Sequence, residues 1–377
     1  SSTESFRGTF NGNGFVISNL TIDRPGVSTL GLFQIISGAG EVLDLTLSEV
    51  SIKGSAAVGG IVGRLSQDSD IGGIKGCKVS GIVDVGDGRS VGGIAGIISG
   101  ISTVEEDVRV ENSSFRGLVV GNLNVGGLVG ENDGSTIKGS GSDGEVEVET
   151  QGDLLKASAS RVGGLVGSNG GTIKGSRSSI TIVPDSIELV GGLVGLNGGL
   201  ITKSYSTGDV SGSSAVGGLA GRNADNSDSR IVESWSSSAV SGDKETGGLV
   251  GANGGLVDKS YASGSVSGSQ RVGGLVGINE DVSSASVSES YAVGNVSGNE
   301  DVAGLIGIND GESSSNFWDT ESTGQDSGVG EGVFEGVTGL TTSEMQGGSA
   351  EQNMEGFDFQ NTWNTVMNGY PALQWEE

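Results

Sequence analysis

The 377-residue sequence contains no histidine, one cysteine, three prolines and few aromatic residues. Without histidine, it cannot form a Ser-His-Asp or Cys-His catalytic centre or a histidine-based metal site. A single cysteine, Cys77, excludes an internal disulfide. No apolar run reaches the 18 residues of a transmembrane helix, and the polar start without a signal peptide is typical of a processed, secreted chain.

Basic residues are also scarce, because 20 Lys and Arg stand against 47 Asp and Glu, for a formal net charge of -27. Such a chain repels phosphate, which excludes nucleic acid as a partner. Its surface also repels itself, which favours high salt or bound cations. The charge therefore predicts a salt-loving microbe or a calcium-rich extracellular setting, and no cofactor other than Ca²⁺ or other cations.

Glycine, by contrast, is abundant, with 73 residues, and much of it lies in one repeated hexapeptide, Val-Gly-Gly-Leu-Val-Gly at residues 162–167. Near copies occupy residues 58–63, 91–96, 125–130, 190–195, 216–221, 246–251, 272–277 and 302–307, and residues 29–33 are a worn first copy. Successive copies begin 26 to 37 residues apart. A motif that recurs at such intervals is the signature of a solenoid.

The residues between the hexapeptides are short runs of Val, Ile, Ser and Thr without helical periodicity. Interior glycines cost a helix about 1 kcal/mol each, so helical repeats are disfavoured. The sequence predicts an all-β parallel β-helix of about ten turns. We expect an aromatic-rich N-terminal cap at residues 1–28, repeats at 29–312 and an aromatic-rich C-terminal cap at 313–377, in which residues 341–344 have capping-box spacing.

Several of these segments match a known family. The chain resembles the GLUG-motif repeats of bacterial and archaeal surface proteins in residues 195–199 and 259–268, in the opening residues 10–14 and in residues 317–320. The resemblance implies an extracellular β-solenoid of the kind found in adhesin-like proteins. It implies no ligand.

A slot for small residues lies six positions before a Val or Ile in each repeat. We place Thr46, Cys77 and Ser113 in this slot, followed by serines in later repeats. Cys77 is therefore expected to be buried and unpaired, between Thr46 and Ser113. A second file consists of asparagines two positions after each hexapeptide: Asn132, Asn169, Asn197, Asn223, Asn253, Asn279 and Asn309. They form either an amide ladder, which we favour, or a row of ligand contacts.

An aromatic file follows the small-residue slot. Its members are Tyr205, Trp235, Tyr261 and Tyr291, with Phe317 next in line. If the slot faces inward, these rings face outward. They are the candidate ligand-binding residues, stacking on sugar rings, although they could equally cover each other.

The hexapeptide raises another alternative, because its fourth and fifth positions are both apolar. Adjacent strand residues normally face opposite sides. Either glycine bends bury both positions, which we favour, or the fifth position forms an exposed stripe for self-association.

Catalytic and metal sites have little support. The candidate carboxylate clusters are residues 105–107, 145–149, 225–228 and 280–281, interpreted as solvated loops without known Ca²⁺-loop spacing. Three sequons, at Asn19, Asn112 and Asn295, permit N-glycosylation.

We therefore predict a non-catalytic structural or adhesive protein, located outside the cell or on its surface. It would serve as a stalk, an adhesin module or a filament or surface-layer subunit. Its expected partners are cell-surface or matrix components, glycans among them, and other copies of itself. The alternative is a carbohydrate-binding or carbohydrate-degrading β-helix, including a virion tail-spike-like protein.

Overall fold

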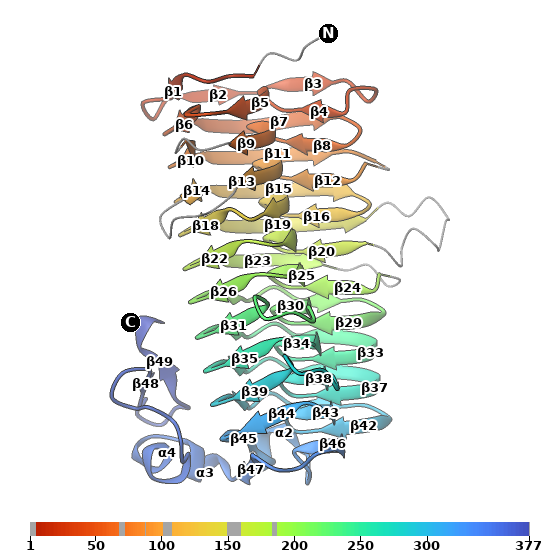
Figure 1. Cartoon of the computed structure of the whole chain (residues 1–377), viewed down its shortest axis with the longest axis vertical. Helices are drawn as coiled ribbons and strands as arrows, with labels where there is room; N and C mark the ends of the chain where they lie inside the picture. Colours follow the sequence, from red (N-terminus) through yellow and green to blue (C-terminus); the bar gives the residue numbers. More distant parts are fainter. Residues whose placement is uncertain are drawn as a thin grey trace.

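The computed structural model describes residues 5–67, 72–86, 88–100, 108–148, 160–182 and 187–376. The chain winds into an upright stack of coils, with the N-terminus at one end of the rod (Figure 1). In the coil at residues 172–197, β22 (Thr172–Lys174), β23 (Arg177–Ile182), β24 (Leu189–Gly191) and β25 (Val194–Asn197) follow one another. Each pairs in parallel with its equivalent in the next coil, as Ile173 does with Ile201.

Three long sheets result, and we number them by the order in which a coil meets them. In the described residues, sheet 1 contains eleven strands: β1 (Thr9–Asn11), β6 (Glu41–Leu43), β10 (Gly73–Lys75), β14 (Val108–Glu111), β18 (Thr136–Lys138), β22, β26 (Leu200–Thr202), β31 (Arg230–Val232), β35 (Leu256–Asp258), β39 (Ser286–Ser288) and β44 (Glu312–Ser314).

Sheet 2 is the widest, because most coils cross it with two or three strands. Its members are β2 (Val16–Ser18), β3 (Thr21–Asp23), β4 (Thr29–Leu30), β7 (Thr46–Lys53), β8 (Ala57–Gly59), β11 (Lys78–Asp84), β12 (Ser90–Gly92), β15 (Ser114–Gly121), β16 (Asn124–Gly126), β19 (Gly141–Val148), β20 (Arg161–Gly163), β23, β24, β27 (Tyr205–Ser206), β28 (Val210–Ser211), β29 (Ser214–Gly217), β32 (Trp235–Ser236), β33 (Val240–Gly247), β36 (Tyr261–Ala262), β37 (Val266–Gly273), β40 (Tyr291–Ala292), β41 (Val296–Ser297), β42 (Glu300–Ala303), β45 (Asn316–Asp319) and β47 (Val337–Leu340).

Sheet 3 begins inside each hexapeptide. Its strands are β5 (Phe33–Ser37), β9 (Val62–Gln67), β13 (Ala95–Gly100), β17 (Val129–Asp133), β21 (Val166–Asn169), β25, β30 (Ala220–Asn223), β34 (Val250–Asn253), β38 (Val276–Asn279), β43 (Ile306–Asn309) and β46 (Val329–Gly332). The parallel β-helix predicted from the repeats is therefore confirmed.

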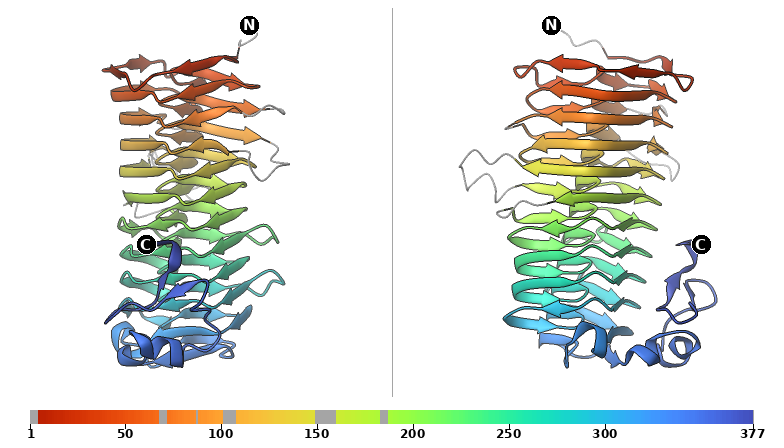
Figure 2. Two further views of the ribbon diagram at one scale, coloured as in Figure 1. Left: turned by 90° about the vertical axis from the view of Figure 1, so that its left-hand side faces the viewer. Right: turned by 180° about the vertical axis from the view of Figure 1, so that it is seen from behind.

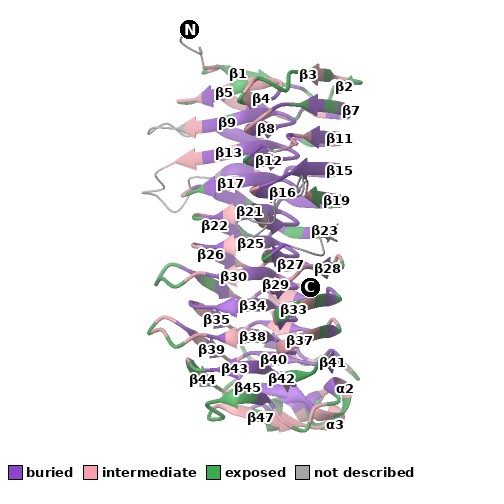
Figure 3. Cartoon of the chain, turned by 90° about the vertical axis from the view of Figure 1, so that its right-hand side faces the viewer, coloured by how far each residue is buried: buried purple, intermediate pink, exposed green. Residues whose placement is uncertain are grey.

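The hexapeptide forms the corner between sheets 2 and 3. At the corner of residues 162–167, a Cβ on Gly163 would overlap the carbonyl oxygen of Val166, so only glycine lets the two strands approach this closely. Leu165 and Val166, at the fourth and fifth positions, are both 0% exposed. The same burial recurs down the rod (Figure 3). The favoured interpretation, burial of both positions, is confirmed, so the fifth position does not form an exposed apolar stripe.

The asparagine file is an amide ladder, as favoured. Each Nδ2 donates to the Oδ1 of the asparagine in the next coil at 2.7 to 2.9 Å, from Asn132 through to Asn309. The side chains are buried, and most Nδ2 atoms also donate to a backbone carbonyl of their own corner. The ladder satisfies polar groups inside the rod and leaves none facing a ligand.

The small-residue slot is a second ladder. The backbone N–H of Ser204 donates to Ser234 Oγ at 3.3 Å, and that of Cys77 donates to Ser113 Oγ at 3.1 Å. The predicted neighbour on the other side of Cys77 was wrong. Lys78, not Cys77, pairs with Thr46, so Cys77 lies level with Leu45. β7 contains one extra residue, at a bulge near Glu49, whose φ is 54°. After the bulge, Ile52 pairs with Val83, so the six-residue spacing from Thr46 to Ile52 matches that from Cys77 to Val83 although Thr46 is not in the slot.

Cys77 itself is buried and free, as predicted. Burial raises the pKa of its thiol to about 11. We therefore expect Cys77 to resist a bulky thiol reagent at neutral pH in the native protein and to react at once in denaturant. A Ser51→Cys variant, which adds an exposed thiol on β7, should react rapidly without denaturant. Equal native rates for Cys77 and this added cysteine would contradict the placement.

The predicted N-terminal cap, residues 1–28, is in its described part mostly a coil of its own. β1 pairs with β6, and β2 and β3 pair with β7. Phe6 extends sheet 3 through a bridge to Ile36 and packs its ring against Phe33 at 4.7 Å. Phe15, by contrast, is 73% exposed. The aromatic residues of this segment therefore cover only part of the end of the core.

The predicted C-terminal cap, residues 313–377, divides into two parts. β45 to β47 and α2 (Thr320–Thr323) complete the last coil. Residues 341–376, which we call the C-terminal arm, then run back along the outside of the rod (Figures 1 and 2). The arm contains α3 (Thr342–Met345), α4 (Gly348–Asn353), the antiparallel pair β48 (Trp363–Asn364) and β49 (Ala372–Leu373), and η1 (Gln374–Glu376). The capping box at Thr341 is confirmed at the start of α3.

Candidate functional site

The aromatic file is a continuous stack along sheet 2. Tyr205, Trp235, Tyr261 and Tyr291 begin β27, β32, β36 and β40, which pair in register. Successive ring centroids are 4.4, 5.8 and 5.0 Å apart, with interplanar angles of 8°, 12° and 2°. The one-coil spacing of a parallel sheet is close to the stacking distance of aromatic rings, so the repeat itself builds the file.

The C-terminal arm covers this file. Trp363 lies against Tyr261 and Tyr291, with ring centroids 6.3 and 5.6 Å away. Trp375 lies 6.4 Å from Tyr205, and its Nε1 donates to the carbonyl of Glu233 at 2.9 Å. Tyr291 is 1% exposed.

The position of the arm bears directly on the predicted sugar contacts. Tyr291 has no ring face open to a ligand, while Tyr205, Trp235 and Tyr261 stay partly exposed. In this structure, the rings of the file pack mainly against the C-terminal arm. Sugar stacking along the whole file would require the arm to leave.

Polar contacts hold the arm as well. Tyr261 Oη donates to Glu376 at 3.0 Å, and Tyr291 Oη donates to the carbonyl of Pro371. Burial raises the pKa of both tyrosines and that of Glu376. The tyrosines therefore remain protonated hydrogen-bond donors at any physiological pH.

Asp319 ties the arm to the last coil. Its Oδ1 caps α2 by accepting from the N–H groups of Glu321 and Ser322, while its Oδ2 accepts from Thr342 Oγ1 at 2.6 Å and from Tyr370 Oη at 2.5 Å. Burial alone would raise the pKa of Asp319, but these four hydrogen bonds lower it below the ordinary 3.8.

The lowered pKa predicts a pH dependence. The ionised form stabilises the fold above pH 3.8, the unfolded value, and this contribution is lost as pH falls through the lower folded pKa. We expect Asp319→Asn to cost about 1–3 kcal/mol at neutral pH and nothing once wild-type Asp319 is protonated. Urea unfolding across pH measures this difference. Asp326→Asn, the same change at an exposed site, should have no effect; equal losses would contradict the assignment.

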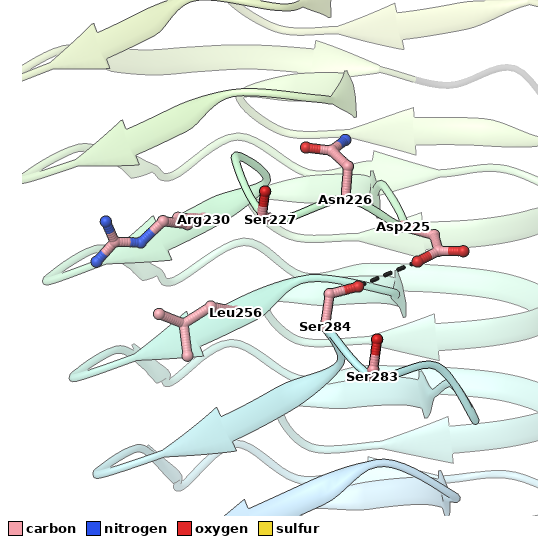
Figure 4. A pocket seen from close by; sticks show the side chains of 7 residues that line it. All are labelled: Asp225, Asn226, Ser227, Arg230, Leu256, Ser283 and Ser284. Atoms are coloured by element: carbon pink, nitrogen blue, oxygen red, sulfur yellow. Dashed lines mark hydrogen bonds between the residues drawn. The ribbon is translucent and has the colours of Figure 1, made fainter.

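The acidic segments 225–228 and 280–281 lie in two similar loops, two coils apart. In both loops the chain makes the same pair of turns, with Asn226 N bonded to Ala224 O and Val282 N to Glu280 O. Ser284 Oγ donates to Asp225 Oδ1 at 3.0 Å across a shallow pocket (Figure 4). Glu280 forms a two-pronged ion pair with Arg222 at 2.7 and 2.8 Å. Asp225 and Glu280 therefore tie together coils that are two apart.

The remaining predicted positions are scattered. Glu145 and Glu147 are exposed on β19, in a strand instead of a loop, and residues 105–107 and Glu149 lie outside the described residues. The side chains of Asn19, Asn112 and Asn295 are exposed, so glycosylation stays a prediction. In the described parts of the chain, no group of three His, Cys, Asp or Glu side chains could hold a metal ion. No helix there is long and apolar enough to cross a membrane.

Parts of this chain are similar in sequence to known proteins. The family described as the GLUG motif matches residues 121–147 and 187–211. Two segments of this β-solenoid thus match the GLUG motif, as the hexapeptides indicated. A 96-residue segment is 38% identical to Halomucin of Haloquadratum walsbyi (strain DSM 16790 / HBSQ001), covering 26% of this chain and 1% of that protein. The match thus involves a very small part of the relative. No solved structure matches the chain significantly.

Proposed function

We propose that this chain is a non-catalytic structural module of an extracellular or cell-surface protein, where it acts as a stiff spacer or adhesive stalk. The observation that carries this proposal is the unbroken asparagine ladder, which runs through seven successive coils. Buried amides that bond to their equivalents in the next coil and to backbone carbonyls resist bending and separation of coils.

The surface supports an extracellular, salt-rich setting. The charge of -27 is spread over a rod on which several basic side chains pair with a carboxylate of the next coil, as Lys203 does with Glu233 and Lys259 with Glu289. The relative from Haloquadratum walsbyi bears a name that describes a mucin. A secreted mucin-like protein in brine would need such a surface to stay in solution.

A single-molecule pulling experiment tests the mechanical role. Stretched between its ends in concentrated KCl, the rod should unfold in steps of one to a few coils, since the strands of each coil pair only with those of adjacent coils. An Asn223→Ala variant should yield at lower force, and Asn226→Ala, which changes an exposed amide, should not. Release of reducing ends from a polysaccharide panel by the purified chain would overturn the non-catalytic assignment.

The charge also predicts salt dependence. Raising KCl from about 0.1 M to about 1 M shortens the screening length from roughly 10 to 3 Å, which weakens repulsion among carboxylates. The melting temperature should rise over this range, and a smaller rise should follow millimolar Ca²⁺ at low salt. A melting temperature that is flat in KCl, with and without a chelator, would contradict the prediction.

A further inference from the structure

One pocket departs from the acidic character of the molecule. It lies where strands β8, β12 and β16 of sheet 2 approach β9, β13 and β17 of sheet 3, a region visible in Figure 3. The pocket has a volume of about 400 Å³, within the range of about 300–1,000 Å³ typical of small-ligand sites. Two arginines, Arg64 and Arg89, line it together with Glu131. We call it the arginine pocket.

The two arginines are notable because the chain has only 20 basic residues against 47 acidic ones. Both are exposed, and in the described part of the chain neither guanidinium forms an ion pair. A planar guanidinium binds carboxylate and sulfate groups through two parallel hydrogen bonds. Because no carboxylate of the described residues pairs with them, the guanidinium groups of Arg64 and Arg89 are both available to bind an anion in the arginine pocket.

The floor of the arginine pocket is a fixed polar network. Ser90 and Asn124 are 2% and 4% exposed. Both donate to Glu131 Oε2, at 3.2 and 3.1 Å, and Arg161 Nη1 donates to Asn124 Oδ1 at 3.3 Å. Glu131 Oε1 accepts no hydrogen bond from the described residues, so one carboxylate oxygen is held in place with its acceptor capacity unused. Such pre-organisation lowers the entropy cost of binding.

From these features we propose that the arginine pocket binds an acidic sugar, meaning a ring that carries a carboxylate or sulfate group beside free hydroxyls. The anionic group pairs with Arg64 and Arg89, and a ring hydroxyl donates to Glu131. Ile97 and Leu123 supply apolar wall for the C–H face of the ring. Glu131 repels ligands that are anionic on every side, such as oligophosphates, and favours one that presents both charge and hydroxyl donors.

The proposal goes beyond a structural role, and it uses a surface separate from the aromatic file. Its residues come from the segments 28–29, 56–64, 89–97 and 123–131, while the aromatic file begins at Tyr205 and lies beneath the C-terminal arm. Binding in the arginine pocket therefore needs no movement of the arm.

Calorimetric titration of the whole chain at constant ionic strength tests the proposal. The probes are a galacturonate tetramer, its methyl ester and a sulfated galactan tetramer. We expect one or both charged tetramers to bind, and the neutral ester to bind at least about tenfold more weakly. Arg64→Ala/Arg89→Ala should lose affinity by a similar factor while keeping its melting temperature, since both side chains are exposed.

The matched control is Arg116→Ala/Arg177→Ala, which removes the same charge from exposed positions of β15 and β23 outside the pocket. It should bind like wild type. Equal losses in the two double variants, or no binding of either charged tetramer, would overturn the proposal. Free sulfate or tetraglutamate binding as tightly as the sugars would also overturn it, by assigning the pocket to a simple anion or to an acidic peptide.

Discussion

A Val194→Asp variant should fail to fold under conditions in which the wild-type protein is stable. Val194 occupies the fifth hexapeptide position at the start of β25 and is 0% exposed among other core side chains. A carboxylate placed there has no partner and loses its hydration, a penalty of about 4–5 kcal/mol or more. That approaches the whole stability of many domains, about 5–15 kcal/mol. Circular dichroism and hydrogen exchange measure the loss.

The matched control lies two residues further along the same strand. Leu196 is partly exposed and pairs with Arg222 of the next coil. Leu196→Asp adds the same charge to the same strand, and it should fold with a change of no more than about 1 kcal/mol. A folded, monomeric Val194→Asp protein would show that the corner tolerates a charge, and the buried position of the fifth residue would then be wrong.

Trp363→Ala should release the C-terminal arm from the rod. Trp363 is 0% exposed and stacks on Phe357 at 4.8 Å, in addition to its contacts with Tyr261 and Tyr291. Removing such a side chain costs about 3–5 kcal/mol. Phe357 and Trp375 also contact rings of the rod, but the arm packs in a cluster separate from the main core of the coils, so we expect it to detach while the coils stay folded. Limited proteolysis should then cut within residues 341–376 and leave the solenoid intact.

Met367, on the same arm, provides the control because it is 88% exposed. Met367→Ala should leave both the protease resistance and the unfolding midpoint unchanged. If Trp363→Ala instead unfolds the coils together with the arm, the arm is an obligate part of the core and not a separable cover.

Repetition made the coil predictable from sequence. Positions four and five are buried in all nine full hexapeptides, and the asparagines from Asn132 to Asn309 bond alike, because most of these residues face copies of themselves in the adjacent coils. Local irregularities were not predictable. Thr46 has the right size and spacing for the small-residue slot, yet the bulge near Glu49 shifts the register so that Leu45 occupies the slot position. Only the pairing of whole strands distinguishes the two registers.

The covering of the aromatic file was missed for a different reason. The alternation of strand residues correctly turned Tyr205 and its neighbours away from the slot, but it carries no information about what lies over them. The signal was present in the arm, whose Trp363, Tyr370 and Trp375 are unusual in an otherwise aromatic-poor chain. The arginine pocket left even less trace, because Arg64, Asn124 and Glu131 meet only through the stacking of coils.

The asparagine ladder also bears on how such a protein changes over generations. Because every ladder asparagine occupies the same corner and bonds in the same direction, excising the residues between two successive ones joins equivalent positions. Duplication does the reverse. Unequal recombination between repeats can therefore shorten or lengthen the rod in increments of one strand spacing, about 4.8 Å, without creating a faulty junction. The length of the rod can therefore change under selection by one coil at a time.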